Sequence, residues 1–197
     1  MAHPVCPWWL GYMLLNPLRR LFEDPAKLLR PLLREGMVVL EPGCGMGFFT
    51  LEAARLAGPS GRVVAVDLQP RMLAGLRRRA ARAGLADRID ARLAAADRLG
   101  VADLAGTVDV ALAIHVVHEL PDRRAFLAEV RAALKPDGCL LIIEPKGPVS
   151  ADAFAATLGD AGEEGLRRVE CPVARSGLVA LLAPQPWTGM LRQSEPR

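Results

Sequence analysis

The feature that most constrains the fold is a glycine-rich turn directly after an apolar run, Val38-Val39-Leu40-Glu41-Pro42-Gly43-Cys44-Gly45-Met46-Gly47-Phe48-Phe49-Thr50. Glycine at alternate positions allows positive φ and lets backbone N–H groups approach a ligand, because no Cβ stands between them. A second apolar run, 63–66, ends in Asp67, twenty residues after Gly47. An acid at the tip of a neighbouring parallel strand is typical of a site that binds a ribose diol. The pattern predicts a strand, a ligand-binding turn and a helix.

Residues 39–50, 63–67 and 108–122 together resemble the class I S-adenosylmethionine-dependent methyltransferases, and the similarity covers roughly residues 36–146. The resemblance implies S-adenosylmethionine as cofactor, with the glycine turn under its methionine part and Asp67 on its ribose hydroxyls. It further implies that an acid approaches the methionine amino group and that an apolar residue and a second acid meet the adenine. The implied cofactor positions are Glu41, Gly43, Cys44, Gly45, Gly47, Asp67, Leu68, Asp97 and Ile114.

Other interpretations of these residues stay open. The dinucleotide fingerprint G-x-G-x-x-G would need a glycine where Phe48 stands, which disfavours a nicotinamide enzyme. The glycine turn can also be a tight connection that binds no ligand. Asp97 can cap the turn that begins at Arg98 instead of contacting a cofactor.

Beyond the glycine turn, strands and helices alternate as in a doubly wound α/β sheet. Helix-stop turns are predicted at 58–61 and 135–138. The resemblance implies a Rossmann-like sheet of seven strands in the order 3-2-1-4-5-7-6, with the last strand antiparallel. The predicted strands are 37–41, 62–67, 89–93, 108–114, 139–144, 165–170 and 178–182, and the predicted helices are 48–56, 71–83, 123–134 and 151–162.

Composition excludes several other classes of protein. A chain of 197 residues with 51% hydrophobic residues suits one well-buried core. The net charge is only +3 and aromatic residues are few, so a nucleic-acid substrate is disfavoured. The four cysteines form no C-x-x-C pair and no metal-finger spacing, which indicates a reduced, cytoplasmic protein without a metal site. The apolar run 8–15 is too short to span a bilayer.

Candidate catalytic side chains stand at the ends of the fourth and fifth predicted strands. His115 and His118 come directly after it, and Glu144 ends the fifth predicted strand. One interpretation makes His115, His118 or Glu144 a general base near the transferred methyl group. A metal site would need a further ligand with suitable spacing. In the third interpretation, His118 and Glu119 precede a helix near Asp122, and His115 only shapes the pocket.

The N-terminal segment is the predicted place of substrate recognition. Residues 1–36 form a helical lid in this interpretation, residues 37–183 form the cofactor-binding domain, and 184–197 form a flexible tail. Trp8, Trp9 and Tyr12 make the segment apolar and aromatic, as a lid over a lipophilic or aromatic acceptor would be. The alternatives are a helix packed on the sheet and an amphipathic patch on a membrane surface.

The sequence therefore predicts an S-adenosylmethionine-dependent methyltransferase that acts on a small molecule, nearest to the type-11 group of quinone-biosynthesis and arsenite enzymes. The acceptor atom, oxygen, nitrogen, sulfur or carbon, stays open. A catalytically idle methyltransferase fold that binds the cofactor or a partner protein is the first alternative. A nicotinamide-dependent reductase is the second.

Overall fold

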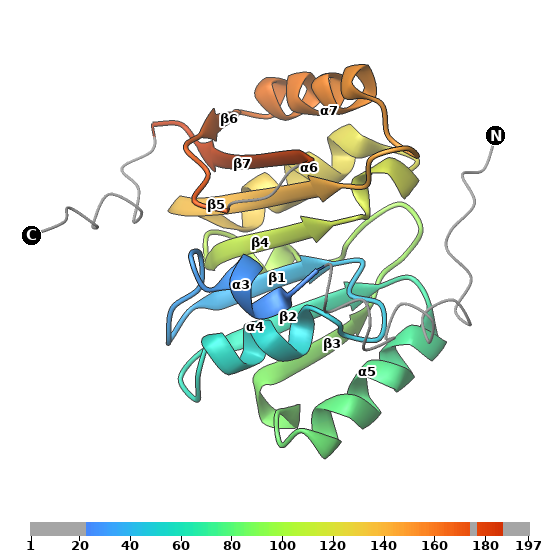
Figure 1. Ribbon diagram of the computed structural model, residues 1–197, viewed down its shortest axis with the longest axis vertical. Helices are drawn as coiled ribbons and strands as arrows, with labels where there is room; N and C mark the ends of the chain where they lie inside the picture. Colours follow the sequence, from blue (N-terminus) through green and yellow to red (C-terminus); the bar gives the residue numbers. More distant parts are fainter. Residues whose placement is uncertain (1–22, 174–176, 187–197) are drawn as a thin grey trace, which may run out of the picture.

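The computed structural model describes residues 23–173 and 177–186. Their core is one seven-stranded sheet in the order β3-β2-β1-β4-β5-β7-β6 (Figure 1). Only β7 runs antiparallel to its neighbours, β5 and β6. The predicted strand order is confirmed. The strands are β1 (Val38–Pro42), β2 (Arg62–Asp67), β3 (Ile89–Leu93), β4 (Val108–Ile114), β5 (Leu134–Glu144), β6 (Leu166–Val169) and β7 (Leu178–Pro184).

Helices cover both faces of the sheet. One apolar cluster joins one face to α3, α4 and α5, and a second joins the opposite face to α6 and α7. In Figure 1, α3 and α4 lie in front of the sheet and α6 lies behind it. The sheet is the middle layer of three. The helices are α3 (Pro25–Leu29), α4 (Thr50–Leu56), α5 (Pro70–Arg82), α6 (Arg123–Ala133) and α7 (Ala151–Glu163), with short 3-10 turns η1 (Ala86–Arg88), η2 (Ala102–Leu104) and η3 (Val117–Glu119).

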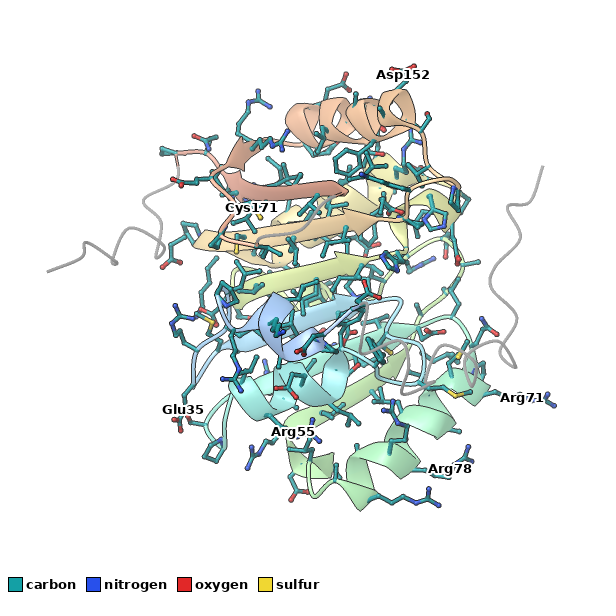
Figure 2. The ribbon with its side chains drawn as sticks, in the orientation of Figure 1. Glu35, Arg55, Arg71, Arg78, Asp152 and Cys171 are labelled. Atoms are coloured by element: carbon teal, nitrogen blue, oxygen red, sulfur yellow. The ribbon has the colours of Figure 1, made fainter. Side chains whose placement is uncertain are left out.

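Burial on both faces explains why the central strands are almost continuous apolar runs. Every residue of β4 is buried, and successive residues alternate between the two clusters, with Leu112 in the first and Ala113 in the second. The helices carry their polar side chains outward. Figure 2 shows Arg71 and Arg78 extending away from α5, as expected for a solvated helix face.

The turn predicted at 135–138 lies inside a strand instead. β5 begins at Leu134, which pairs with Val108, and the next pair is Cys139 with Val110. Between these two pairs, residues 135–138 of β5 lie opposite Asp109 of β4, and the extra residues form a bulge. At Gly138 a Cβ would lie 2.7 Å from the Val108 carbonyl oxygen, so the backbone approaches β4 too closely for a side chain. The irregular pairing explains why the segment has the composition of a turn.

Part of the segment predicted as a lid belongs to the core. Leu28 and Leu29 of α3, with Leu32 and Leu33 after it, are buried in the cluster that contains α4 and β1. Asp24 caps α3 by accepting hydrogen bonds from the N–H groups of Ala26 and Lys27. Trp8, Trp9 and Tyr12 lie outside the described residues, as does 187–197 of the predicted tail. No helix within residues 23–173 and 177–186 is long and apolar enough to cross a membrane.

A buried carboxylate links β1, β4 and β5 near their N-terminal ends, on the side of the sheet opposite the pocket described below. Asp109, only 4% exposed, accepts hydrogen bonds from the Val38 N–H at 2.7 Å and from Lys135 Nζ at 2.6 Å. We expect Asp109→Ala to lower the free energy of unfolding by about 2 kcal/mol, because it leaves the partly buried Val38 N–H and the Lys135 ammonium without this partner.

Urea unfolding measures this effect. Asp103→Ala is the matched control, since Asp103 pairs with Arg92 at an exposed position. Its loss should be much smaller, because exposed ion pairs contribute little. Equal losses in the two variants would show that Asp109 contributes no more than a surface acid.

Candidate functional site

The glycine turn between β1 and α4 has the backbone conformation that the sequence predicts. Gly43, Gly45 and Gly47 have φ values of 69°, 54° and 80°. The N–H groups of Gly43 and Cys44 donate to the Val66 carbonyl oxygen at 2.8 and 3.1 Å, which ties the turn to β2. Non-glycine residues rarely adopt these values, so the turn depends on glycine for its shape.

The three glycines have different surroundings. A Cβ at Gly43 would lie 2.6 Å from Val116 Cγ2, and one at Gly47 would overlap Leu76 Cδ1 of α5. A Cβ at Gly45 would meet no atom within 4 Å. Gly43 and Gly47 therefore permit close packing, and Gly45 alone keeps a space open. Gly47 does not line the pocket described below, so its contribution is the contact between the turn and α5.

Alanine substitutions at Gly45 and Gly84 distinguish two roles of a glycine: leaving space for a ligand and permitting positive φ. Gly84, which ends the turn after α5, has φ 66°, and a Cβ there would likewise meet no atom within 4 Å. Alanine should cost each site about 1 kcal/mol of stability, because both sites need positive φ. Only Gly45→Ala should also weaken binding of the cofactor that the resemblance implies, by about tenfold or more, because its methyl group occupies the open space. Calorimetric titration with S-adenosylhomocysteine measures this, and equal affinities in the two variants would contradict it.

Asp67 organises the turn from the end of β2. Its Oδ2 accepts a hydrogen bond from the Gly45 N–H and its Oδ1 accepts one from the Gln69 N–H, both at 2.8 Å. Burial raises the pKa of this carboxyl, and the N–H groups of Gln69, Gly45 and Leu68 oppose the shift. Each oxygen keeps a further lone pair, so the carboxylate can still accept hydrogen bonds from a ligand.

Glu41, at the end of β1, is buried beside Asp67. It is 4% exposed, and its Oε2 has no hydrogen-bond partner among the residues that the structure describes. Burial raises the pKa of Glu41 to about 8, and the negative charge of Asp67 adds to the shift, while the Thr50 hydroxyl opposes it. A buried carboxyl oxygen without a partner at a pocket wall is a place where a ligand can supply one.

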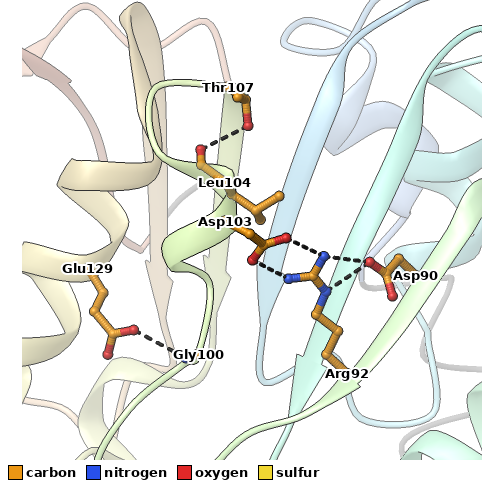
Figure 3. A network of polar contacts seen from close by, with 7 residues as sticks. All are labelled: Asp90, Arg92, Gly100, Asp103, Leu104, Thr107 and Glu129. Carbon is orange, nitrogen blue, oxygen red and sulfur yellow. Dashed lines mark hydrogen bonds and ion pairs between the residues drawn. The ribbon is translucent and has the colours of Figure 1, made fainter.

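The loop after β3 is held by a residue that the sequence did not single out. Glu129 of α6 accepts hydrogen bonds from the N–H groups of Leu99 at 2.9 Å and Gly100 at 3.2 Å. Figure 3 shows the bond to Gly100. Glu129 follows the buried Phe126 by about one helical turn. Its position at the margin of the apolar face of α6 is the only feature of the sequence that could have indicated this role. Asp97, on the same loop, is exposed and pairs with Arg98 at 3.2 Å.

His115 adopts a strained backbone conformation directly after β4. Its φ is 58°, and its N–H donates to the Ile143 carbonyl oxygen at 2.7 Å, which extends the pairing with β5. Its Nε2 lies 3.6 Å from Oε1 of the buried Glu23. Positive φ in a residue other than glycine is typical of functional sites, where neighbouring contacts hold the strain.

His118 pairs with Glu144 at the end of β5. Its Nδ1 lies 2.5 Å from Glu144 Oε2, and Glu144 Oε1 accepts a hydrogen bond from the Val117 N–H at 2.9 Å. The Glu144 side chain is 2% exposed and that of His118 is 27% exposed. Burial raises the pKa of Glu144, and the neighbouring His118 opposes the shift. The carboxyl thus orients the ring through one nitrogen and leaves Nε2 for other contacts.

These side chains surround one pocket of about 550 Å³ at the carboxyl ends of the parallel strands, where β1 and β4 lie side by side. Ligands of open α/β sheets bind at such a place. Glu41, Gly43, Cys44, Gly45, Asp67, Leu68, Asp97, Ile114, His115 and His118 line it. Glu144 does not line it and lies behind His118. The apolar part of the wall includes Met46, Phe48, Met72, Leu99, Leu120 and Phe126.

A doubly wound sheet with an acid-anchored glycine turn is typical of nucleotide-binding α/β proteins, and comparison with known proteins narrows this class. The family model described as "Methyltransferase domain" matches residues 33–180. The chain therefore belongs to the class I S-adenosylmethionine-dependent methyltransferases. A solved S-adenosylmethionine-dependent methyltransferase from Aquifex aeolicus has a similar fold, with a TM-score of 0.77 and 24% identity over 90% of this chain and 97% of that one.

Curated relatives include enzymes that methylate different atoms. Nocamycin O-methyltransferase from Saccharothrix syringae is 34% identical over 74% of this chain and 49% of its own length. Ubiquinone biosynthesis O-methyltransferase from Methylocella silvestris is 33% identical over 64% of this chain and 46% of its own length. Other relatives are named as C-methyltransferases and an arsenite methyltransferase. The chain spans about half the length of the curated relatives it matches first.

The residues present fit the cofactor of this family. Position 45 is open, Asp67 keeps lone pairs toward the pocket, and Glu41 Oε2 lacks a partner among the described residues. A group with ribose hydroxyls and an ammonium would satisfy these acceptors. No group of three or more His, Cys, Asp or Glu side chains suited to a metal ion occurs in the described part of the chain.

Proposed function

We propose that this protein transfers a methyl group from S-adenosylmethionine to a hydroxyl group of a small lipophilic or aromatic molecule. One observation carries the proposal: the acid-anchored glycine turn and His118, whose Nδ1 Glu144 holds from behind, line the same pocket. The first supports cofactor binding. The second supports an acceptor that must lose a proton.

The cofactor would be held by residues of four strand ends. Asp67 would accept hydrogen bonds from the ribose hydroxyls and Glu41 would meet the methionine amino group, while the open space at Gly45 admits the methionine part. Leu68 and Asp97 would lie at the adenine, a role supported by the 38% exposure of Leu68, which is high for a leucine at a pocket wall. Ile114 would contribute backbone contacts.

When bound, S-adenosylmethionine supplies a methyl group on a positively charged sulfonium. The chain itself has to align the acceptor, exclude water and take up the acceptor's proton. His118 takes the proton on Nε2 while the carboxyl of Glu144 keeps the proton on Nδ1 in place and stabilises the resulting imidazolium. With the acceptor's proton on Nε2, the acceptor oxygen would be free to take the methyl group from the sulfonium, with S-adenosylhomocysteine as the leaving group.

The apolar wall favours an acceptor of low polarity. Trp8, Trp9 and Tyr12 lie outside the described residues, and their contact with the acceptor is part of this proposal. The names of two relatives as O-methyltransferases support a hydroxyl acceptor. A cytoplasmic location agrees with the cysteine composition.

Calorimetric titration with S-adenosylmethionine and S-adenosylhomocysteine tests the cofactor, with Asp67→Ala as the control variant. We expect Asp67→Ala to weaken binding by about 1 to 3 kcal/mol through lost charge-assisted hydrogen bonds. An acceptor screen with phenols, catechols and hydroquinones then follows the release of S-adenosylhomocysteine. Binding without turnover would favour the idle fold, and preference for a nicotinamide cofactor would favour a reductase.

A further inference from the structure

Glu41 is a buried acid whose charge is stabilised by a hydroxyl, that of Thr50, and by no cation of the described residues. It belongs to β1, between β2 and β4, and 4% of its surface is exposed. No ion pair joins it to a cation of the described residues, and its Oε2 has no hydrogen-bond partner among them. A buried carboxylate in this position would lose its hydration and gain little beyond the Thr50 hydroxyl in return, whereas a carboxylic acid would lose much less.

The elements packed against Glu41 bring one acid, one thiol and one hydroxyl close to it, and two histidines line the same pocket. Asp67 of β2 brings a negative charge, and Cys44 of the turn is a neutral thiol whose pKa burial raises. From α4 comes only the Thr50 hydroxyl, and from α5 the charge of Arg77 acts on Cys44. His115 and His118, which follow β4, line the same pocket. The nearest charge is therefore negative and disfavours a second carboxylate.

We propose that Glu41 is protonated in the free protein and releases its proton when a ligand carrying an ammonium group enters the pocket. The inference rests on the proposed function, because S-adenosylmethionine and S-adenosylhomocysteine both carry this ammonium. The O–H bond of the carboxylic acid breaks, its proton passes to the buffer, and the carboxylate accepts a charge-assisted hydrogen bond from the ammonium. The protein remains neutral at Glu41 until the compensating charge arrives.

The direction of the pKa shift agrees with this geometry. Burial and the Asp67 charge raise the pKa of Glu41 to about 8, so the acid form predominates near neutral pH. An ammonium at Oε2 would lower that pKa again, because an opposite charge favours the carboxylate. Ligand binding and proton release are then linked, and either one promotes the other.

Calorimetric titration in two buffers of different ionisation enthalpy, phosphate and Tris, measures the protons released. We expect about one proton per S-adenosylhomocysteine bound at pH 7. Two matched controls isolate Glu41. 5′-Methylthioadenosine has the adenosine and sulfur but no ammonium, so it should bind without this release. Glu41→Gln keeps the shape but has no proton to lose, so it should bind S-adenosylhomocysteine about tenfold more weakly and release none.

The outcomes separate this inference from the proposed function. Tight binding of S-adenosylhomocysteine without proton release would overturn the inference and leave the proposed function intact. Equal release by Glu41→Gln would assign the proton to another pocket group, His115 or His118, and would also overturn it. Absence of binding would contradict the proposed function itself.

A measurement on the free protein tests the inference even if S-adenosylhomocysteine does not bind. The infrared difference spectrum between the wild-type protein and Glu41→Gln at pH 7 should contain the carbonyl stretch of a protonated carboxylic acid. A carboxylate band in its place would overturn the inference whatever the protein binds.

Discussion

Replacement of His118 by glutamine is expected to lower the rate of methyl transfer by about 100-fold or more, because general base catalysis contributes on this scale. Affinity for S-adenosylhomocysteine should hardly change, since His118 is assigned to the acceptor. Glutamine keeps a polar side chain of similar reach but cannot take up a proton. The turnover number at saturating cofactor, measured with an acceptor from the phenol screen, checks this expectation.

Two comparison variants distinguish a base from a residue that only shapes the pocket. His115→Asn, in which asparagine tolerates the positive φ of this position, should lower the rate much less, because His115 lies against Glu23. Glu144→Gln should change the pH dependence of the rate, because it removes the charge that orients and stabilises the His118 ring. An undiminished rate in His118→Gln would remove His118 from catalysis and favour an acceptor that needs no base.

Glutamine in place of Glu41 is expected to abolish a large pH dependence of stability. The pKa of Glu41 is raised from 4.5 to about 8 in the folded protein. Between these values the native state binds more protons than the unfolded state, so stability is lost as the pH rises. The loss amounts to about 1.4 kcal/mol per pH unit. Between pH 5 and pH 7 it reaches on the order of 3 kcal/mol.

Urea unfolding of both proteins at several pH values between 5 and 8 measures this effect. Groups that do not interact with Glu41 titrate alike in the two proteins, so the difference in unfolding free energy reports Glu41 together with its neighbour Asp67. Glu35→Gln serves as the control, because Glu35 is exposed in the loop before β1 and extends away from the core. Its pH dependence should match that of the wild-type protein. A constant difference between the wild-type protein and Glu41→Gln would mean that Glu41 is ionised throughout this range.

Most of the framework could be predicted because it depends on local pattern. Largely apolar, β-branched runs such as 108–114 favour central strands of a covered sheet, and the alternation of strands and helices predicts a doubly wound fold. The resemblance supplied the strand order, including the antiparallel β7. The bulge before Cys139 was missed because a proline and a glycine in close succession predict a turn, and only pairing with β4 keeps this segment in the sheet.

The positions of the candidate site residues were predictable, but their partners were not. Asp67 was recognisable because an acid that ends an apolar strand lies at the carboxyl end of a parallel sheet, and Glu41 was assigned through the resemblance. The sequence contains no signal that pairs His118 with Glu144, 26 residues away, or Glu129 with the loop at Leu99 and Gly100. These contacts depend on how α6 and β5 pack.

The sequence by itself thus determined which residues form strands, where the chain must turn on glycine, and which acids stand at the strand ends. These properties follow from side-chain polarity and backbone freedom, which act over a few residues. Only the tertiary structure decided that Glu41 is buried with Oε2 unpartnered among the described residues, that Gly45 faces open space while Gly47 packs on Leu76, and that Glu144 lies behind His118. These properties follow from desolvation and from distances between segments far apart in the chain, which exist only once the sheet and helices have packed.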